Sequence, residues 1–357
     1  MDHYSLKPLP DPLKDKTSGP DMDYIYFKNS AAFPFFPEEN SYSPGNAWWL
    51  AEASFLAYCH PGFVRMAFHI AGFTEFQFFN GPGTECMVAS SGKASIVAFR
   101  GTETSSLSFF HELATDLNTI PVPFPEGGIV HQGFLKGLEE VWEQKDEEYT
   151  KKNPTHKTGL HLCLRQLLAD HPDRPLWVCG HSLGGALATL CYARIPEARG
   201  LYIYGAPRVG DSDFNALIAG RPAFRIEHAG DPIPLVPPQI PSIGFNFQDT
   251  GKLVYINRQG EILEERPRLD SWSGLEREKT ISLEEKKSET EIIQNWKNLP
   301  EDMKSLDTNL KQIGAHVKMS FHNWTGYLEM MYDDFAPSIE DHMPVYYAIK
   351  LWNLLNE

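Results

Sequence analysis

The sequence predicts an α/β fold in which a mostly parallel central sheet is flanked by helices. Short apolar runs of the kind that form buried strands alternate with segments whose apolar residues recur at helical spacing. Parallel strands need crossover connections of about a dozen residues or more, and helices of that length separate these runs. The central strand runs are residues 176–179, 201–204 and 223–226.

Helices are expected on both sides of this sheet. The segments with helical spacing are residues 47–58, 134–144, 160–170, 185–194 and 213–219, and a further one ends the chain. Three stretches rich in β-forming residues precede the central strands, at 74–80, 85–89 and 95–100. These stretches predict additional strands.

Composition gives the domain organisation. The Pro-, Asp- and Ser-rich residues 1–46 are expected to form an extended arm that straps over the domain. The α/β domain is expected to span residues 47–258 and 315–357. Between these two parts, residues 259–314 are dense in Glu and Lys and poor in large apolar residues, which predicts a charged helical insertion or cap, or a surface that binds a partner.

The charge and cysteine content narrow the function classes. A formal charge of −15 over 357 residues opposes binding to nucleic acid and to anionic membranes, so any contact with lipid must be mainly apolar. Five cysteines without a C-x-x-C pair favour reduced thiols. No signal peptide and no apolar run of membrane-spanning length is visible, so we expect a cytoplasmic protein or one exported without a conventional signal.

One motif has the context that nucleophilic catalysis requires. Residues 180–184 read G-H-S-L-G, between the strand run that ends at Cys179 and the helical segment that begins at Gly185. A sharp turn from strand to helix lifts a serine hydroxyl clear of the backbone, and the glycines on either side prevent a collision. The N-terminus of the helix also stabilises a developing oxyanion. The motif therefore favours Ser182 as the nucleophile of an α/β-hydrolase.

A serine hydroxyl needs a base to accept its proton and an acid to orient that base. In this fold the acid and then the histidine follow the serine along the chain. Asp231 follows the strand run 223–227 and precedes Pro232, which places its carboxylate at the carboxyl end of the sheet. His342 lies in a turn directly before the terminal helical segment. The predicted triad is Ser182, Asp231 and His342.

Other carboxylates and imidazoles compete for these roles. Asp211 and Asp213 flank a helical piece and are better interpreted as residues that cap it. Four other histidines are interpreted as surface, packing or hydrogen-bonding residues: His131, His181, His316 and His322.

Several motifs in the same order resemble the class 3 lipase family, which contains fungal triacylglycerol lipases. They are AFRGT from Ala98, TDLN from Thr115, VHQGF from Val130, GHSLGGALATL from Gly180, YGAPRVGD from Tyr204, DPIPLVPP from Asp231, and Asp341-His342. The resemblance covers about residues 46–258 and the last twenty or so residues. It implies the same triad, and it implies that the oxyanion is bound by the backbone N–H groups of Thr102 and Leu183, with the Thr102 hydroxyl as a further donor.

The family usually has a lid between Thr102 and Asp116. An amphipathic stretch here would cover an apolar acyl groove in water and open at a lipid surface, although a permanently packed surface helix fits the same pattern. One face of this stretch carries Leu107, Phe110, Ala114 and Leu117, and the residues expected to line the lid are Leu107, Phe109, Phe110 and Leu113.

The resemblance implies a serine hydrolase that cleaves carboxylic esters of lipids through an acyl-enzyme, as a triacylglycerol lipase or esterase. A phospholipase A1, a feruloyl-type esterase and a monoacylglycerol-type enzyme remain open. A binding protein that has lost catalysis is disfavoured because all three triad positions are filled. No cofactor or metal is expected, since H-E-x-x-H and C-x-x-C are absent from the sequence. The expected partner is a lipid or small ester at a lipid–water interface.

Overall fold

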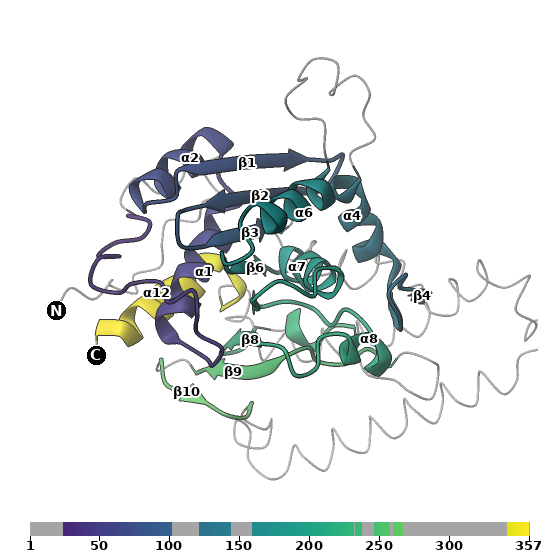
Figure 1. Cartoon of the computed structure of the whole chain (residues 1–357). Coiled ribbons are helices and arrows are strands. Elements are labelled where there is room, and N and C mark those ends of the chain that lie inside the picture. The colour runs from purple at the N-terminus through teal and green to yellow at the C-terminus, as the bar shows by residue number, and fades with distance from the viewer. Residues whose placement is uncertain are drawn as a thin grey trace, which may run out of the picture.

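An eight-stranded sheet forms the centre of the molecule (Figure 1). The structure is a computed structural model that describes residues 24–101, 121–143, 159–231, 233–237, 246–257, 260–266 and 341–356. The strand order is β1-β2-β3-β6-β7-β8-β9-β10. The strands are β1 (Glu75–Asn80), β2 (Glu85–Ser90), β3 (Ser95–Phe99), β6 (Leu176–His181), β7 (Gly200–Tyr204), β8 (Ala223–His228), β9 (Lys252–Ile256) and β10 (Ile262–Leu263).

The five central strands of this sheet, from β3 to β9, are parallel to one another. Antiparallel pairs extend the sheet at both edges, through β1 and β2 on one side and β10 on the other. β4 (Pro121–Pro123) and β5 (Ile129–His131) form a separate two-stranded sheet. The predicted α/β-hydrolase class, with a mostly parallel sheet flanked by helices, is confirmed.

Helices cover both faces of the sheet. One face packs against α1 (Pro44–Leu56), α2 (Pro61–Ile70) and α12 (Pro344–Asn356). The opposite face packs against α4 (Gln132–Trp142), α6 (Leu160–Asp170), α7 (Leu183–Arg194) and α8 (Ser212–Ala216). Successive residues of a strand point to opposite faces, so Trp177 and Val178 of β6 belong to different cores. Both faces are apolar because both are covered.

The N-terminal segment 24–43 lies against the same core as α1. The indole of Trp49 donates to the Phe33 carbonyl at 2.7 Å, and that of Trp177 donates to the Pro37 carbonyl at 3.0 Å. The domain boundary expected at residue 46 stays a prediction, and α1 begins two residues before it, at Pro44. The Ser43 hydroxyl accepts the Asn46 N–H and caps the helix at that point.

The charged segment predicted for residues 259–314 lies mostly outside the described residues. Its described beginning is not helical. Ile262 and Leu263 form the edge strand β10, which pairs with Ile256 and Tyr255 of β9. The open edge of β9 supplies unpaired backbone groups there, and pairing with them outweighs the helical composition of the segment.

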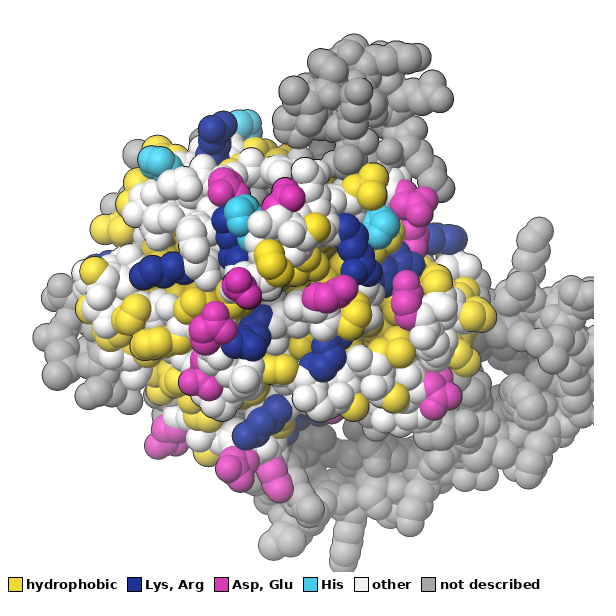
Figure 2. All heavy atoms as spheres, viewed as in Figure 1, with side chains coloured by type: hydrophobic (Ala, Val, Ile, Leu, Met, Phe, Trp, Pro, Cys, Tyr) yellow, Lys and Arg dark blue, Asp and Glu magenta, His cyan; other side chains and the backbone are white. Residues whose placement is uncertain are grey.

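On the face shown in Figure 2, acidic and basic side chains of the described residues are interspersed with apolar and uncharged polar ones. Within the described ranges, every helix is too short or too polar to cross a membrane. The five cysteines are all described, and each is a free thiol.

Candidate active site

Ser182 stands at a sharp turn between β6 and α7. Its backbone has φ 57° and ψ −130°, a conformation that a residue with a side chain adopts only when its surroundings enforce it. The strand ends one residue before Ser182 and the helix begins one residue after it. The serine hydroxyl is thereby held at the carboxyl end of the parallel strands, where the G-x-S-x-G motif predicts it.

Two glycines of the motif make this turn possible. A Cβ on Gly180 would stand 2.2 Å from the Gly184 carbonyl oxygen, and a Cβ on Gly184 would stand 2.3 Å from the Phe99 carbonyl oxygen. Real side chains do not tolerate such distances. The glycines therefore allow α7 to start in direct contact with the ends of β3 and β6.

The structure brings the three predicted triad residues together. The Nε2 atom of His342 lies 3.0 Å from the Ser182 hydroxyl. On the other side of the ring, His342 Nδ1 lies 2.9 Å from Oδ2 and 3.0 Å from Oδ1 of Asp231. All three residues are buried. This is the geometry in which an imidazole shares the proton of a hydroxyl while a carboxylate fixes the orientation of the ring.

The comparisons with known proteins agree with this geometry. Residues 96–240 match the family described as Lipase (class 3). Over this part of its length the chain is similar to class 3 lipases. A phospholipase A1-II 6 of rice is 28% identical over 221 aligned positions, and the match covers 51% of this chain and 51% of the relative. A lipase of Rhizomucor miehei is 30% identical over 187 aligned positions, and the match covers 48% of this chain and 45% of the relative.

The chain spans about half the length of the curated relatives it matches. Among solved structures, the lipase of Rhizopus microsporus var. chinensis has a TM-score of 0.45 and 23% identity. That similarity covers 67% of this chain and 82% of the other.

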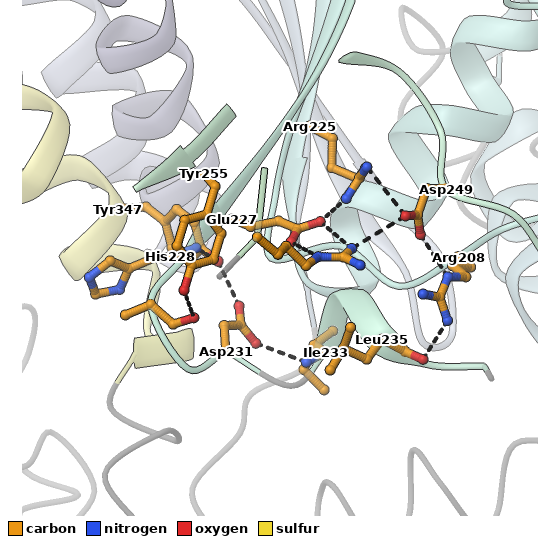
Figure 3. Close-up of polar contacts among 12 residues, drawn as sticks. Arg208, Arg225, Glu227, His228, Asp231, Ile233, Leu235, Asp249, Tyr255 and Tyr347 are labelled. Carbon is orange, nitrogen blue, oxygen red and sulfur yellow. Dashed lines mark hydrogen bonds and ion pairs between the residues drawn. The ribbon is translucent and has the colours of Figure 1, made fainter. Parts of the chain in front are cut away.

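The Asp231 carboxylate has further hydrogen-bond donors besides His342 (Figure 3). Tyr347 of α12 donates its hydroxyl to Asp231 Oδ2 at 2.6 Å, and the Ile233 N–H donates to Oδ1 at 2.9 Å. Burial and the neighbouring Asp231 raise the pKa of Tyr347 well above its ordinary value, so the phenol remains a donor. No signal in the sequence pointed to Tyr347, because a single tyrosine in the terminal helical segment matches no catalytic motif.

The space beside Asp231 also depends on a glycine of the YGAPRVGD motif. Gly205 has φ +52°, and a Cβ there would stand 2.4 Å from Asp231 Oδ2 and 3.0 Å from His342 Nδ1. A larger residue would therefore strain the backbone and displace the Asp231–His342 pair.

The turn that carries Asp231 contacts the segment 341–342 that carries the histidine. The Gly230 N–H donates to Asp341 Oδ2 at 3.0 Å, and His228 Nδ1 lies 3.0 Å from the Asp341 carbonyl oxygen. Ala229 between them has φ 44°, and its carbonyl accepts the Tyr255 hydroxyl at 2.7 Å. These contacts join the end of β8 to the start of α12, which are more than a hundred residues apart in the sequence.

The same strand carries a cluster of ions in which Arg225 and Glu227 are buried and the other members are partly buried. Glu227 pairs with Arg225 and Arg266, while Asp249 pairs with Arg208 at 2.7 Å. Arg225 and Arg266 each have a nitrogen 3.4 Å from Asp249. Burial lowers the pKa of Arg225 to about 10, so it remains a cation at neutral pH.

This cluster holds the chain that follows Asp231. Besides its pair with Asp249, the Arg208 guanidinium donates to the carbonyls of Leu235 at 2.6 Å and Pro237 at 2.9 Å. The Arg208 N–H donates to the Val236 carbonyl at 2.8 Å. Arg208 belongs to the YGAPRVGD motif, so a sequence signal for it existed, although its role could not be read without the fold.

The competing candidates occupy other positions. Asp211 accepts the Phe214 N–H and caps α8, as interpreted, whereas Asp213 lies in the first turn of that helix. His131 caps α4 by accepting the Gly133 N–H at 3.0 Å, and burial lowers its pKa to about 3. His181 is buried beside His342. His316 and His322 lie outside the described residues.

The predicted oxyanion donors are only partly described. Leu183 is the first residue of α7, where backbone N–H groups have no acceptor within the helix. Thr102 and the expected lid residues Leu107, Phe109, Phe110 and Leu113 lie outside the described residues, so their assignments stay predictions. Within the described part of the chain, no three or more His, Cys, Asp or Glu side chains are grouped to hold a metal ion.

Proposed function

We propose that this chain hydrolyses carboxylic esters of lipids through an acyl-enzyme on Ser182, with His342 as the general base and Asp231 as the orienting acid. The observation that supports this most strongly is the continuous pair of contacts through His342, at 3.0 Å to the serine hydroxyl and 2.9 Å to the carboxylate. Such a chain activates a hydroxyl that is otherwise a poor nucleophile.

The reaction would proceed in two halves. The Ser182 oxygen attacks the ester carbonyl carbon while its proton passes to His342 Nε2, and the carbonyl oxygen becomes an oxyanion. The backbone N–H of Leu183, with that of Thr102, is the proposed donor to this oxyanion. When the tetrahedral intermediate collapses, His342 returns the proton to the departing alcohol and leaves the acyl group on Ser182.

Water completes the cycle. It attacks the acyl carbonyl while His342 Nε2 accepts its proton, and the second tetrahedral intermediate releases the carboxylic acid as the proton returns to the Ser182 oxygen. The buried carboxylate of Asp231 holds the ring in the tautomer with the proton on Nδ1, and it stabilises the imidazolium that forms twice in each turnover.

Lipid esters are the proposed substrates because the relatives of this chain include proteins named lipase, phospholipase A1 and mono- and diacylglycerol lipase. Triacylglycerol is the first candidate. A phospholipase A1 or feruloyl-type activity is the alternative. A panel of triacylglycerols with increasing acyl length, a diacyl phospholipid labelled at the sn-1 chain and a feruloyl ester separates these specificities.

Covalent labelling tests the mechanism. A fluorophosphonate should modify the full chain once, and peptide mapping should place the adduct on Ser182. Ser182→Ala should abolish both labelling and turnover of a soluble ester, with a fall of about 10⁴-fold or more in kcat, because the nucleophile is lost. Ser212→Ala, at the start of α8, is the matched control and should retain both.

Either of two results would exclude this assignment. One is turnover by the folded Ser182→Ala protein, and the other is an adduct that maps to another residue. A parent protein that neither reacts nor hydrolyses any ester of the panel would instead support the alternative of a binding protein with a hydrolase fold.

A further inference from the structure

His181, the residue directly before the proposed nucleophile, is buried between two elements of the site. Its Nδ1 atom lies 2.9 Å from the Tyr58 hydroxyl, just beyond the end of α1. Its Nε2 atom lies 2.5 Å from the backbone carbonyl oxygen of His342. The rings of His181 and His342 are tilted against each other, with centroids 4.5 Å apart.

These contacts fix the tautomer of His181. A carbonyl oxygen only accepts hydrogen bonds, so the proton must be on Nε2. Burial, together with the neighbouring His342, lowers the pKa of His181 well below its ordinary value, so the ring is neutral. In a neutral ring with a proton on Nε2, Nδ1 is an acceptor, and Tyr58 is therefore the donor. The hydrogen bonds run in one direction, from Tyr58 through His181 to the His342 carbonyl.

The position of His342 explains why such a contact matters. Asp341 and His342 are helical, and Met343 separates them from α12. The last carbonyls of a helical segment receive no hydrogen bond from within that segment. The Asp341 carbonyl faces His228 Nδ1 at 3.0 Å. Two consecutive carbonyls at this helical end are thus contacted by two buried imidazoles, one from β6 and one from β8.

We propose that His181 is a positioning residue, which uses its Nε2–H to hold the backbone of the general base at the correct distance from the nucleophile, while Tyr58 holds the ring through a hydrogen bond to Nδ1. The inference rests on the proposed ester hydrolysis. His181 and Ser182 share a peptide bond, so the group that anchors the base moves with the nucleophile. The 3.0 Å separation of Ser182 Oγ and His342 Nε2 is then set by one rigid unit.

The neutral state of His181 serves the same purpose. During each half-reaction His342 carries an additional proton, and a second cation 4.5 Å away would oppose that charge. A buried neutral imidazole donates a hydrogen bond without this repulsion. The Tyr58 hydroxyl is neutral and does not favour the cationic ring, whereas a carboxylate in its place would stabilise it.

Kinetics on a soluble 4-nitrophenyl butyrate substrate test the positioning role. His181→Leu removes both ring nitrogens and should lower kcat about 10- to 100-fold with KM little changed, because a small displacement of the base affects the reaction more than binding. His181→Gln retains an N–H donor near the position of Nε2 and should recover kcat to within about fivefold of the parent. Tyr58→Phe should lower kcat about three- to tenfold.

His131→Asn is the matched control, since His131 is also a buried histidine but caps α4 away from the triad. It should leave kcat unchanged. Melting temperatures of all variants separate positioning from folding. If folded His181→Leu retains kcat within twofold of the parent, or if His181→Gln is no more active than His181→Leu, the proposal is overturned. Should His181→Leu fail to fold, an unchanged kcat in Tyr58→Phe overturns it.

A spectroscopic measurement tests the same idea without turnover. In the full chain labelled with ¹⁵N-histidine, His181 should show a protonated Nε2 and an unprotonated Nδ1 from pH 5.5 to 8. A ring protonated on Nδ1, or a cationic ring in this range, contradicts the proposal even if the parent has no esterase activity. A parent that lacks turnover but shows the expected tautomer would reject the proposed function alone.

Discussion

Two adjacent polar regions lie at the end of strand β8, and their buried polar groups are paired in different ways (Figure 3). Glu227 points into the cluster of Arg208, Arg225, Asp249 and Arg266, where every member is charged. His228, the next residue, points to the opposite side, toward α12 and the network around Asp231, where tyrosines and neutral imidazoles supply the hydrogen bonds.

The difference between the two regions corresponds to what each must do. In the first region, side chains that stay charged pair with one another and form a rigid cluster. Arg208 of this cluster holds the backbone from Leu235 to Pro237. In the proposed mechanism a proton moves between Ser182 and His342, and this transfer needs neighbours whose charge does not change with it. The pKa values of His181 and His228 are both lowered by burial, so these rings remain neutral while the triad cycles.

Asp231→Asn should have the largest effect, and it should fall on activity. The amide no longer stabilises the imidazolium and favours the wrong tautomer of His342, so kcat should fall about 10³- to 10⁴-fold with little change in folding stability. Steady-state kinetics and thermal melting measure the two quantities. A folded Asp231→Asn protein with kcat near that of the parent would show that another carboxylate orients the base.

Glu227→Gln should instead lower stability and leave kcat nearly unchanged. Loss of the Glu227 charge leaves three guanidinium groups with Asp249 as the one remaining carboxylate among the described members of the cluster. Breaking a buried ion pair costs about 3–5 kcal/mol of unfolding free energy. Denaturant unfolding measures the loss. In the fraction that remains folded, kcat should stay within a few fold of the parent. A stable Glu227→Gln protein with strongly reduced kcat would mean that the cluster acts on catalysis directly.

His131→Asn should change how the unfolding free energy depends on pH. Burial lowers the pKa of His131 to about 3, whereas an unfolded histidine titrates near 6.5, so the unfolded state binds the proton first as pH falls. The unfolding free energy contributed by this group is therefore complete above about pH 6.5 and is lost toward pH 3, by about 1.4 kcal/mol per pH unit.

Asparagine does not titrate, and its side-chain oxygen can still cap α4. Unfolding of both proteins between pH 4 and 8 should show a shallower acid loss in His131→Asn, on top of a constant offset from the lost ring contact with Phe134. Parallel pH curves for the two proteins would show that His131 is not the source of the acid sensitivity.

Tyr347→Phe should have the smallest effect. It removes one donor to Asp231 and leaves the ring, the Ile233 N–H and His342 in place, so kcat should fall about three- to tenfold with KM unchanged. A loss of melting temperature without any change in kcat would assign the hydroxyl to stability, through its contact with the His228 N–H, instead of to the acid.

The sequence alone predicted the central strands of the sheet and the three residues of the proposed triad. Apolar runs predicted β6, β7 and β8 because buried strands leave a contiguous signal, and G-x-S-x-G predicted the turn at Ser182 because only glycine fits beside it. The order of serine, aspartate and histidine along the chain then identified Asp231 and His342. Each of these signals is local.

Only the tertiary structure decided which residues support the triad. Tyr58, His181, Tyr347 and Asp341 come from distant parts of the chain, and their roles depend on directions and distances that no spacing rule encodes. The same holds for β10, which is a strand because it pairs with the edge of β9, and for the arginine cluster, which exists because Asp249 and Arg266 converge on residues of β8. Local sequence fixes backbone preference, whereas the partner of a buried polar group is fixed by packing.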